Sequence, residues 1–415
     1  MARKMKDSGI EWIGEIPEGW EVVPVKRLCT MQAGKNLTSE QIAPEGTYPV
    51  YGGNGIRGFF SDYNCVGQFL TVGRQGALCG NVHKINGKVW ATEHAVITAP
   101  SSYAILDFLY YLLIGMDLNQ YVSSTAAQPG LAVGTLLNLK TCYPCSTLEQ
   151  TQISNYLNAK CSEIDTMLSR TRSSIEEYKK LKQAVITQAV TKGVRGEREM
   201  KNSKIEGVGN IPIDWNTIKL KYCTYIRARL GWKALKADEY VEIGFPFLSA
   251  FNIVNNTLQF TNLNYINQFR YDESPEIQLS NGDVLLVKDG AGIGKCAIVE
   301  NMPMPSTVNG SIAVVSVTNS LIPKYLYYYF LSKMFQQHID LLKDGMGVPH
   351  LFQSDLKEIK IAFPSKDEQK EIADYLDGKC AEIDGLIAKK EQLVKELESY
   401  KKSLIYEVVT GKREV

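Results

Sequence analysis

Residues 149–165, EQTQISNYLNAKCSEID, recur at residues 368–384 as EQKEIADYLDGKCAEID. The match extends without a gap over residues 146–193 and 365–412, at a fixed offset of 219, with 16 of 48 positions identical. Self-similarity at a fixed offset indicates a repeated structural unit. The chain of 415 residues is long enough for two or three domains. We therefore interpret it as two related halves.

A second match marks the start of each half, where residues 10–20 correspond to residues 205–215. A weaker match pairs Leu109-Tyr110-Tyr111 with Leu326-Tyr327-Tyr328. Between these matches the halves have diverged almost completely, so each half combines a variable domain with a repeated helix. The predicted segments are a first variable domain at 1–145, a central helix at 146–193, a second variable domain at 194–364 and a C-terminal helix at 365–412.

Each repeated segment carries one apolar stripe at alternating spacings of four and three, the heptad pattern of a coiled coil. Neither stripe can be buried by one helix alone, so we expect the two helices to pack on each other within the chain. Polar residues interrupt both stripes at equivalent places, Thr171/Lys390 and Lys182/Lys401. A helix of about 42 residues spans about 63 Å. The predicted seam consists of Leu157, Cys161, Ile164, Leu168, Ile175, Tyr178, Val185, Leu376, Cys380, Ile383, Ile387, Val394, Leu397, Leu404 and Val408.

Short strands and turns dominate both variable domains, which predicts a mixed α/β fold that is mostly β. Each domain ends in an aromatic-rich helix, at Leu106–Gly115 and Lys324–Ser332, and turns are expected at residues 52–55 and 86–87. The predicted strands are Val22–Leu28, Tyr48–Tyr51, Gly67–Val72 and Val89–Thr98 in the first domain, and Ile218–Tyr222, Phe245–Leu248, Asp283–Val287 and Ser311–Val317 in the second.

Several loops carry side chains that are suited to hydrogen bonding with base edges. Arginine is suited to bidentate contact with guanine, and glutamine to bidentate contact with adenine. For any one of these residues, a solvated loop position is the simpler interpretation, and the set carries more weight than its members. The candidates for DNA contact are Asn54, Arg57, Arg74, Gln75 and Gln128 in the first half, and Arg227, Arg229, Trp232, Lys233, Lys236, Lys288 and His350 in the second.

Composition sets few limits on the partner. Lys and Arg total 46 against 45 Asp and Glu, a balance that argues mildly against a nucleic-acid binder. Nine scattered cysteines and the lack of a long apolar segment predict a cytoplasmic chain with reduced thiols and no membrane span. We predict no metal site, because the four histidines show no ligand spacing.

Two motifs resemble catalytic or cofactor-binding sequences only at first sight. Residues 289–296, DGAGIGKC, depart from a phosphate-binding loop at its first glycine and at its magnesium-binding hydroxyl. Cys142-Tyr143-Pro144-Cys145 is a single pair without partners for zinc. The chain also lacks a nucleophile–base constellation and an adenine-methyltransferase tetrapeptide, so we predict that it is not an enzyme. A nucleotide hydrolase that uses residues 290–295 remains a minor alternative.

The doubled arrangement resembles the specificity subunits of type I restriction–modification enzymes. The resemblance covers nearly the whole chain and rests on residues 10–20, the glycine-rich loop 51–58, Gly231-Trp232-Lys233 and the two helix entries at 149–165 and 368–384. It implies that each variable domain is a target-recognition domain that reads one half of a bipartite, asymmetric site in double-stranded DNA. It also implies that the two helices pack antiparallel, under a pseudo-twofold axis, and set the gap between the half-sites.

The same resemblance implies partner subunits that carry the chemistry. Two methylation subunits are expected to bind S-adenosylmethionine and to methylate adenine at N6. Two restriction subunits, where present, are expected to use ATP and Mg²⁺ for translocation and cleavage. No cofactor is expected in this chain. The competing interpretation is a structural coiled-coil adaptor that binds proteins only.

Overall fold

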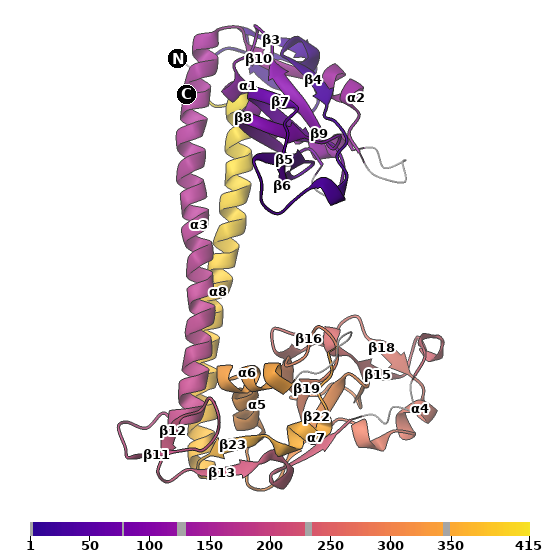
Figure 1. Ribbon diagram of the computed structural model, residues 1–415, viewed down its shortest axis with the longest axis vertical. Helices are drawn as coiled ribbons and strands as arrows, with labels where there is room; N and C mark the ends of the chain where they lie inside the picture. The colour runs from indigo at the N-terminus through magenta and orange to yellow at the C-terminus, as the bar shows by residue number, and fades with distance from the viewer. Residues whose placement is uncertain (1–2, 77–78, 123–129, 229–234, 343–348) are drawn as a thin grey trace. The chain divides into compact units, whose positions relative to one another are not determined.

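The computed structural model describes residues 3–76, 79–122, 130–228, 235–342 and 349–415. It divides into two compact units, and each combines one variable domain with part of both long helices (Figure 1). Unit 1 comprises residues 1–172 and 391–415, so both chain ends belong to it, and unit 2 comprises residues 173–390. The long helices are α3, Thr147–Lys192, and α8, Lys366–Val409. Within the described residues, no helix is long and apolar enough to cross a membrane.

Unit 1 is built around a six-stranded sheet with the order β4-β9-β7-β8-β5-β6. The helix α1, Leu106–Gly115, packs on the sheet and contributes Phe108, Leu109 and Leu112 to the core. A short helix, α2, spans Val133–Asn138. The strands of unit 1 are β1 Met5–Asp7, β2 Glu15–Pro17, β3 Trp20–Pro24, β4 Cys29–Ala33, β5 Tyr48–Gly52, β6 Gly55–Phe60, β7 Cys65–Gly73, β8 Val82–Ala91, β9 Ala95–Pro100 and β10 Lys140–Pro144.

Unit 2 repeats the central part of this plan. Its four-stranded sheet has the order β14-β22-β19-β20, which matches β4-β9-β7-β8, while β18-β15-β21 form a separate sheet. Its strands are β11 Met200–Asn202, β12 Asn210–Pro212, β13 Asn216–Lys219, β14 Thr224–Arg227, β15 Phe245–Leu248, β16 Ile253–Val254, β17 Thr257–Leu258, β18 Asn264–Ile266, β19 Val284–Val287, β20 Cys296–Ile298, β21 Thr307–Val308, β22 Ile312–Val317 and β23 Lys360–Phe363. Its shorter helices are α4 Gln268–Asp272, α5 Pro323–Leu331, α6 Lys333–Leu342 and α7 Gln353–Glu358. The predicted fold class, two mixed and mostly β domains with two long helices, is confirmed.

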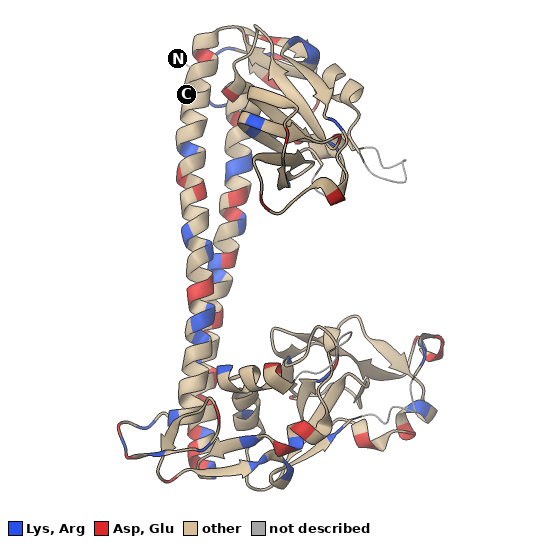
Figure 2. Ribbon diagram, viewed as in Figure 1, with Lys and Arg blue, Asp and Glu red and all other residues tan. Residues whose placement is uncertain are grey.

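The helices α3 and α8 pack antiparallel in each unit, as predicted. In unit 1, Leu157, Cys161, Ile164 and Leu168 of α3 share one core with Leu404, Ile405, Val408 and Val409 of α8. In unit 2, Ile186, Ala189 and Val190 share a core with Ile372, Leu376 and Cys380. Most of the predicted seam is buried, while Tyr178, Val185, Ile387, Val394 and Leu397 are half-buried. Both signs of charge alternate along the exposed faces of α3 and α8 (Figure 2).

The two lysines that interrupt the seam each bind an aspartate of the other helix. Lys401 donates to Asp165 at 2.7 Å in unit 1, and Lys182 donates to Asp384 at 2.6 Å in unit 2. These pairs are equivalent under the offset of 219, which explains why the sequence retains both residue types in both copies. The other interruption differs between the copies, because Thr171 is buried while Lys390 lies over the Tyr178 ring at 5.7 Å.

The repeated Glu-Gln pair at each helix entry joins the helix to its globular domain. Gln150 accepts from the Ile105 backbone N–H at 2.9 Å and donates to the Tyr103 and Pro144 carbonyls, which fixes the start of α1. Gln369 makes the equivalent bonds to Ile322, Ser320 and Pro364 at the start of α5. Both glutamines are fully buried, so these bonds satisfy backbone groups that water cannot reach.

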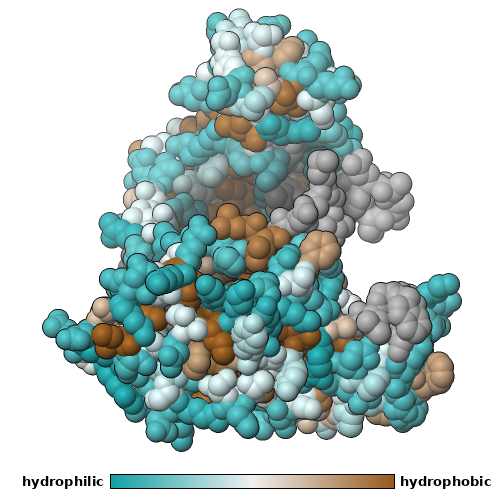
Figure 3. Space-filling view, turned by 60° about the horizontal axis from the view of Figure 1, so that its bottom comes forward, coloured by the Kyte–Doolittle hydropathy of each residue, from teal (hydrophilic) through white to brown (hydrophobic). Residues whose placement is uncertain are grey.

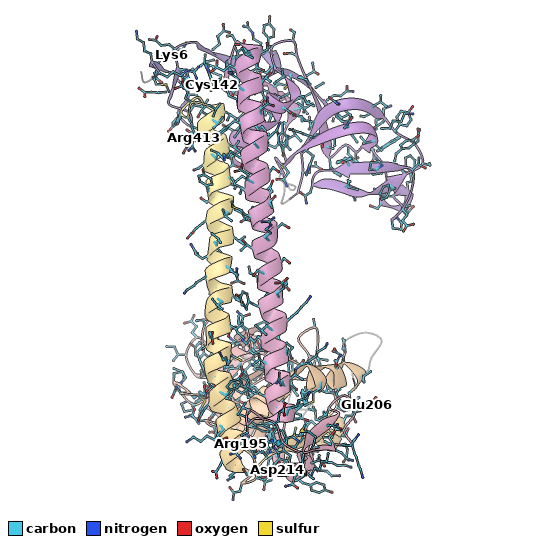
Figure 4. All side chains as sticks on the ribbon, turned by 90° about the vertical axis from the view of Figure 1, so that its left-hand side faces the viewer. Lys6, Cys142, Arg195, Glu206, Asp214 and Arg413 are labelled. Carbon is cyan, nitrogen blue, oxygen red and sulfur yellow. The ribbon has the colours of Figure 1, made fainter. Side chains whose placement is uncertain are left out.

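The glutamate of each pair binds an arginine beside a buried tryptophan. In unit 1, Glu149 accepts from Arg3 and from the Trp20 indole N–H at 3.0 Å. In unit 2, Glu368 accepts from Arg198, whose guanidinium lies 5.7 Å from the Trp215 ring centroid. Figure 4 labels Arg195 and Asp214, which complete this second cluster. Glu368 is 1% exposed, whereas the Glu149 side chain is 28% exposed.

That difference in burial predicts unequal costs for the two arginines. Arg198→Ala leaves a buried carboxylate without its main partner and is expected to destabilise unit 2 by about 2–3 kcal/mol. Arg3→Ala leaves a carboxylate that water reaches, and about 1 kcal/mol is expected for unit 1. Urea unfolding that is followed by hydrogen exchange in each unit measures both costs. If both substitutions lower the free energy of unfolding equally, the burial of Glu368 does not determine the cost of losing its arginine.

Some details of the sequence prediction were wrong. Asn86 and Gly87 lie inside β8 and not in a turn, with Gly87 opposite Gly67 of β7. Both glycines have positive φ, 116° and 110°, so the long β7–β8 ribbon bends where only glycine is unstrained. The predicted strand at 89–98 is two strands separated by a turn at residues 92–94, and residues 25–27 and 220–222 form 3₁₀ turns.

Candidate nucleic-acid interface

The ends of several strands meet at one edge of the sheet in unit 1. Because β4 and β7 both run antiparallel to β9, their last residues, Ala33 and Gly73, lie where β9 begins. The end of β5 joins the same edge, since the Thr92 N–H donates to the Tyr51 carbonyl at 2.9 Å. We call residues 34–37, 53–54, 74–76 and 92–94 the loop edge of unit 1.

Four of the five predicted DNA contacts of the first half lie on or beside this loop edge. Arg74 and Gln75 directly follow β7, and Gln75 pairs with Gly130. Asn54 is exposed and its side-chain oxygen accepts from Asn81 at 2.7 Å. Arg57, on the adjacent strand β6, is exposed and lies so close to Gly52 that a Cβ there would collide with it. Gln128 lies outside the described residues.

Arg74 is held in place through its backbone. Its carbonyl accepts from the Leu131 N–H at 2.8 Å and from the Cys79 thiol at 2.9 Å. Burial raises the pKa of Cys79, so this thiol stays protonated and remains a donor. The Arg74 side chain is half-buried, and its Nε donates to the Leu131 carbonyl at 3.2 Å. The remaining guanidinium N–H groups are the ones suited to a base or phosphate.

Unit 2 has an equivalent loop edge, built by the same hydrogen bonds. The Lys288 N–H donates to Ser311 at 2.8 Å, as Arg74 does to His94 at 2.9 Å. The Leu351 N–H donates to Lys288 at 2.9 Å, as Leu131 does to Arg74. The Asn309 N–H donates to Leu248 at 2.8 Å, as Thr92 does to Tyr51. We call residues 249–252, 288–295, 309–311 and 350 the loop edge of unit 2, because His350 pairs with Asp289.

Two predicted contacts of the second half, Lys288 and His350, meet on this loop edge through Asp289. Lys288 donates to the Asp289 carboxylate at 2.7 Å, and His350 Nδ1 contacts its other oxygen. The His350 ring also packs edge-on against Phe352, with centroids 4.5 Å apart. Asp289 was not among the predicted contacts. The sequence signal that could have found it is its place directly after Lys288, because Lys288-Asp289 follows β19 as Arg74-Gln75 follows β7.

Arg227 and Lys236 make hydrogen bonds elsewhere in unit 2. Arg227 is bound inside its own unit, because its guanidinium donates to Asp283 at 3.0 Å and to Ser316 at 2.7 Å. Lys236 is exposed, and its backbone N–H donates to Glu239 at 2.8 Å. Arg229, Trp232 and Lys233 lie outside the described residues.

The two loop edges thus share a backbone frame and differ in the side chains they carry. Unit 1 offers Asn54, Arg74 and Gln75, whereas unit 2 offers Lys288, Asp289 and His350. The first set contains two amides, and the second pairs both signs of charge. In the view of Figure 3 the surface is mostly polar, with apolar groups dispersed among polar ones. No cluster of three or more metal-binding side chains is present among the residues that the structure describes.

Comparison with known proteins finds the same architecture elsewhere. The family model described as type I restriction modification DNA specificity domain matches residues 17–177 and 212–396. The MjaVIII specificity subunit of Methanocaldococcus jannaschii is 26% identical over 415 residues, which cover 96% of this chain and 93% of that protein. The EcoprrI specificity subunit of Escherichia coli is 40% identical over 159 residues, 37% of each chain.

Two solved structures share the fold. One, from work on complex assembly and conformational transition of the type I R-M system, superposes with a TM-score of 0.71 at 15% identity and covers 96% of this chain and 99% of that one. The other is the HsdS subunit of Thermoanaerobacter tengcongensis, with a TM-score of 0.50 at 15% identity, covering 98% and 100%. At these identities the comparison concerns the fold alone.

Proposed function

Because this chain belongs to the family of type I restriction–modification specificity subunits, we propose that it reads a bipartite, asymmetric site in duplex DNA, one half-site with each unit. Family membership establishes the coarser function, which is DNA sequence recognition by a non-catalytic subunit. The proposal adds that the loop edges of units 1 and 2 make the base contacts.

The observation that carries this proposal is the pair of equivalent loop edges with unlike side chains. A common backbone frame places side chains at matching positions, while their identity decides which base edges they match. Amide and guanidinium groups such as Gln75 and Arg74 suit adenine and guanine, whereas a carboxylate such as Asp289 accepts from cytosine N4. Two unlike edges on one repeated frame therefore suit two different half-sites. The continuous helices α3 and α8 are the proposed spacer between those half-sites.

We further propose that two methylation subunits dock on the chain, one on each unit. The helix pair offers each unit an exposed apolar side chain at an equivalent position, since Tyr400 and Leu181 differ by the offset of 219 and are both 49% exposed. S-adenosylmethionine, ATP and Mg²⁺ would be bound by these methylation subunits and by restriction subunits. Because the chain is proposed to act on DNA, we also propose that it is located in the cytoplasm.

Near-zero net charge fits a division of work between the subunits. Phosphate contacts dominate the affinity of most DNA-binding proteins and require a surplus of Lys and Arg. This chain carries a net charge of +1, so we propose that the methylation subunits supply most phosphate contacts while this subunit supplies base contacts.

Exchange of one recognition domain tests the proposal. Replacement of residues 1–145 by the corresponding domain of a relative with another target is expected to change one half-site and to leave the other unchanged. The measurement is a genome-wide map of N6-methyladenine with the native chain, with the chimera and without the gene. A chimera that folds and changes both half-sites would contradict the assignment of one half-site to each unit. A native chain without sequence-specific methylation or protection would favour the protein-binding adaptor.

A further inference from the structure

Phe251 is a large apolar side chain that is almost fully exposed on the loop edge of unit 2. It is 92% exposed, and no large hydrophobic side chain among the described residues is more exposed. Isolated apolar side chains are common on protein surfaces, so exposure alone assigns no role. The placement and rigidity of Phe251 provide the further evidence.

The turn that carries Phe251 is fixed by hydrogen bonds. The Phe251 N–H donates to the Ser249 hydroxyl at 3.3 Å, and the Asn252 N–H donates to the Ser249 carbonyl at 2.9 Å. The Asn252 side chain accepts from the Ser249 N–H at 2.9 Å and donates to the Thr261 carbonyl at 3.2 Å. A side chain on such a turn loses little backbone entropy when it binds a ligand, so the turn is organised before binding.

Phe251 lies on the same loop edge as the residues proposed to read bases. Its neighbour Ala250 lies close to Gly292, in the loop that starts with Lys288 and Asp289. A Cβ atom added to Gly292 would be 3.8 Å from the Ala250 Cβ. In unit 1, Gly53 lies close to the Gln75 backbone. A Cβ atom added to Gly53 would be 2.9 Å from the Gln75 carbonyl oxygen. Matching the parallel strand pairs β5–β8 and β15–β21 aligns Tyr51 with Leu248 and hence Asn54 with Phe251. The polar candidate of unit 1 is thus replaced by an aromatic ring in unit 2.

We propose that Phe251 contacts the 5-methyl group of a thymine in the major groove of the half-site read by unit 2. Thymine is the base that presents an apolar group in that groove, and phenylalanine is among the side chains that contact it. Of the other residues in this turn, Ser249 and Asn252 are polar and hydrogen-bonded, and Ala250 is small and half-buried, so the turn does not offer a broad apolar surface to a protein partner. This inference rests on the proposed function and assigns one residue of the loop edge to one type of base.

Replacement of thymine by deoxyuridine removes the methyl group and keeps base pairing, which provides the test. The native chain with its methylation partner is expected to bind about fourfold more weakly when one particular thymine of that half-site becomes uracil. Phe251→Ala is expected to lose the same factor on thymine-containing DNA and to be insensitive to uracil. Asn54→Ala, the matched variant in unit 1, should weaken binding through the other half-site and retain the sensitivity to uracil.

The outcomes separate this inference from the proposed function. Sequence-specific binding without a uracil effect at any thymine of the half-site, or a half-site without thymine, overturns the role of Phe251 and leaves the proposed function intact. A loss on Phe251→Ala that is equal for thymine and uracil duplexes also overturns it, because the contact would then be independent of the methyl group. Absence of sequence-specific binding by the native complex overturns both.

Discussion

Trp215→Ala is expected to destabilise unit 2 by about 3–5 kcal/mol, the usual cost of removing a fully buried tryptophan. Trp215 is 0% exposed and belongs to a core that also contains residues from both long helices. Its loss leaves a cavity where the entry of α8, the end of α3 and the second globular domain meet. Chemical denaturation with hydrogen exchange resolved by unit measures the effect. A cost below about 1 kcal/mol would show that this cluster does not hold unit 2 together.

A substitution by phenylalanine separates packing from hydrogen bonding at the two matched tryptophans. The Trp20 indole N–H donates to Glu149 at 3.0 Å. The Trp215 indole N–H is buried and has no acceptor within the described part of the chain. Trp20→Phe is therefore expected to cost about 1 kcal/mol more than Trp215→Phe, because only the first substitution removes a hydrogen bond. The reverse order would contradict the assignment of that bond.

Insertion of one heptad into both long helices is expected to abolish methylation of the native target and to create a target with a longer gap. The proposed insertion sites follow Arg172 and Lys390, where the chain passes between the two units. Seven residues retain the phase of the seam and lengthen each helix by about 10 Å, or about three base pairs of duplex. Because no contact within a unit changes, the half-site sequences should stay the same.

The measurement uses duplexes that differ only in the gap between the half-sites. Methylation of the native duplex should fall by about 100-fold or more, while a duplex with a longer gap becomes the best substrate. A heptad inserted into α3 alone is the matched control, since it shifts one stripe past the other and should reduce stability without giving a new gap. If the double insertion folds with normal helicity and the preferred gap stays fixed, α3 and α8 are not the spacer.

The repeated elements were predictable because their signals lie within a short segment or in the similarity between the two halves of the chain. The heptad stripes determined that α3 and α8 form and that each needs a partner. The offset of 219 marked Gln150 and Gln369, Asp165 and Asp384, and Lys182 and Lys401 as shared, although only the structure explains these identities, by bonds to α1, α5 and the opposite helix. The aromatic helix α1 was predicted with its observed bounds, and α5 within one residue at each end.

The loop edges were harder to predict, because they depend on which strands lie side by side. No local pattern places Asn54 and Gln75, which are 21 positions apart in the sequence, on one edge. Asn86-Gly87 resembles a turn in sequence, yet pairing with Gly67 and Gln68 holds it inside a strand. Phe251 was missed because it stands in the mostly apolar stretch 245–254, FPFLSAFNIV, where a phenylalanine is usually taken for core. The helix α6 was missed as well; its buried side chains are Met334, Phe335 and Ile339, whereas Leu341 is exposed.

The core of unit 1 includes Leu404, Ile405, Val408 and Val409, near the end of the chain. Ribosomes add roughly 5–20 residues per second, so these side chains emerge tens of seconds after Leu168. Throughout that time the first domain lacks the helix that completes its core, and its apolar surface is open to chaperones and to other nascent chains. The domain that is synthesised first is therefore finished last, and translation speed and chaperone supply should influence the yield of native protein.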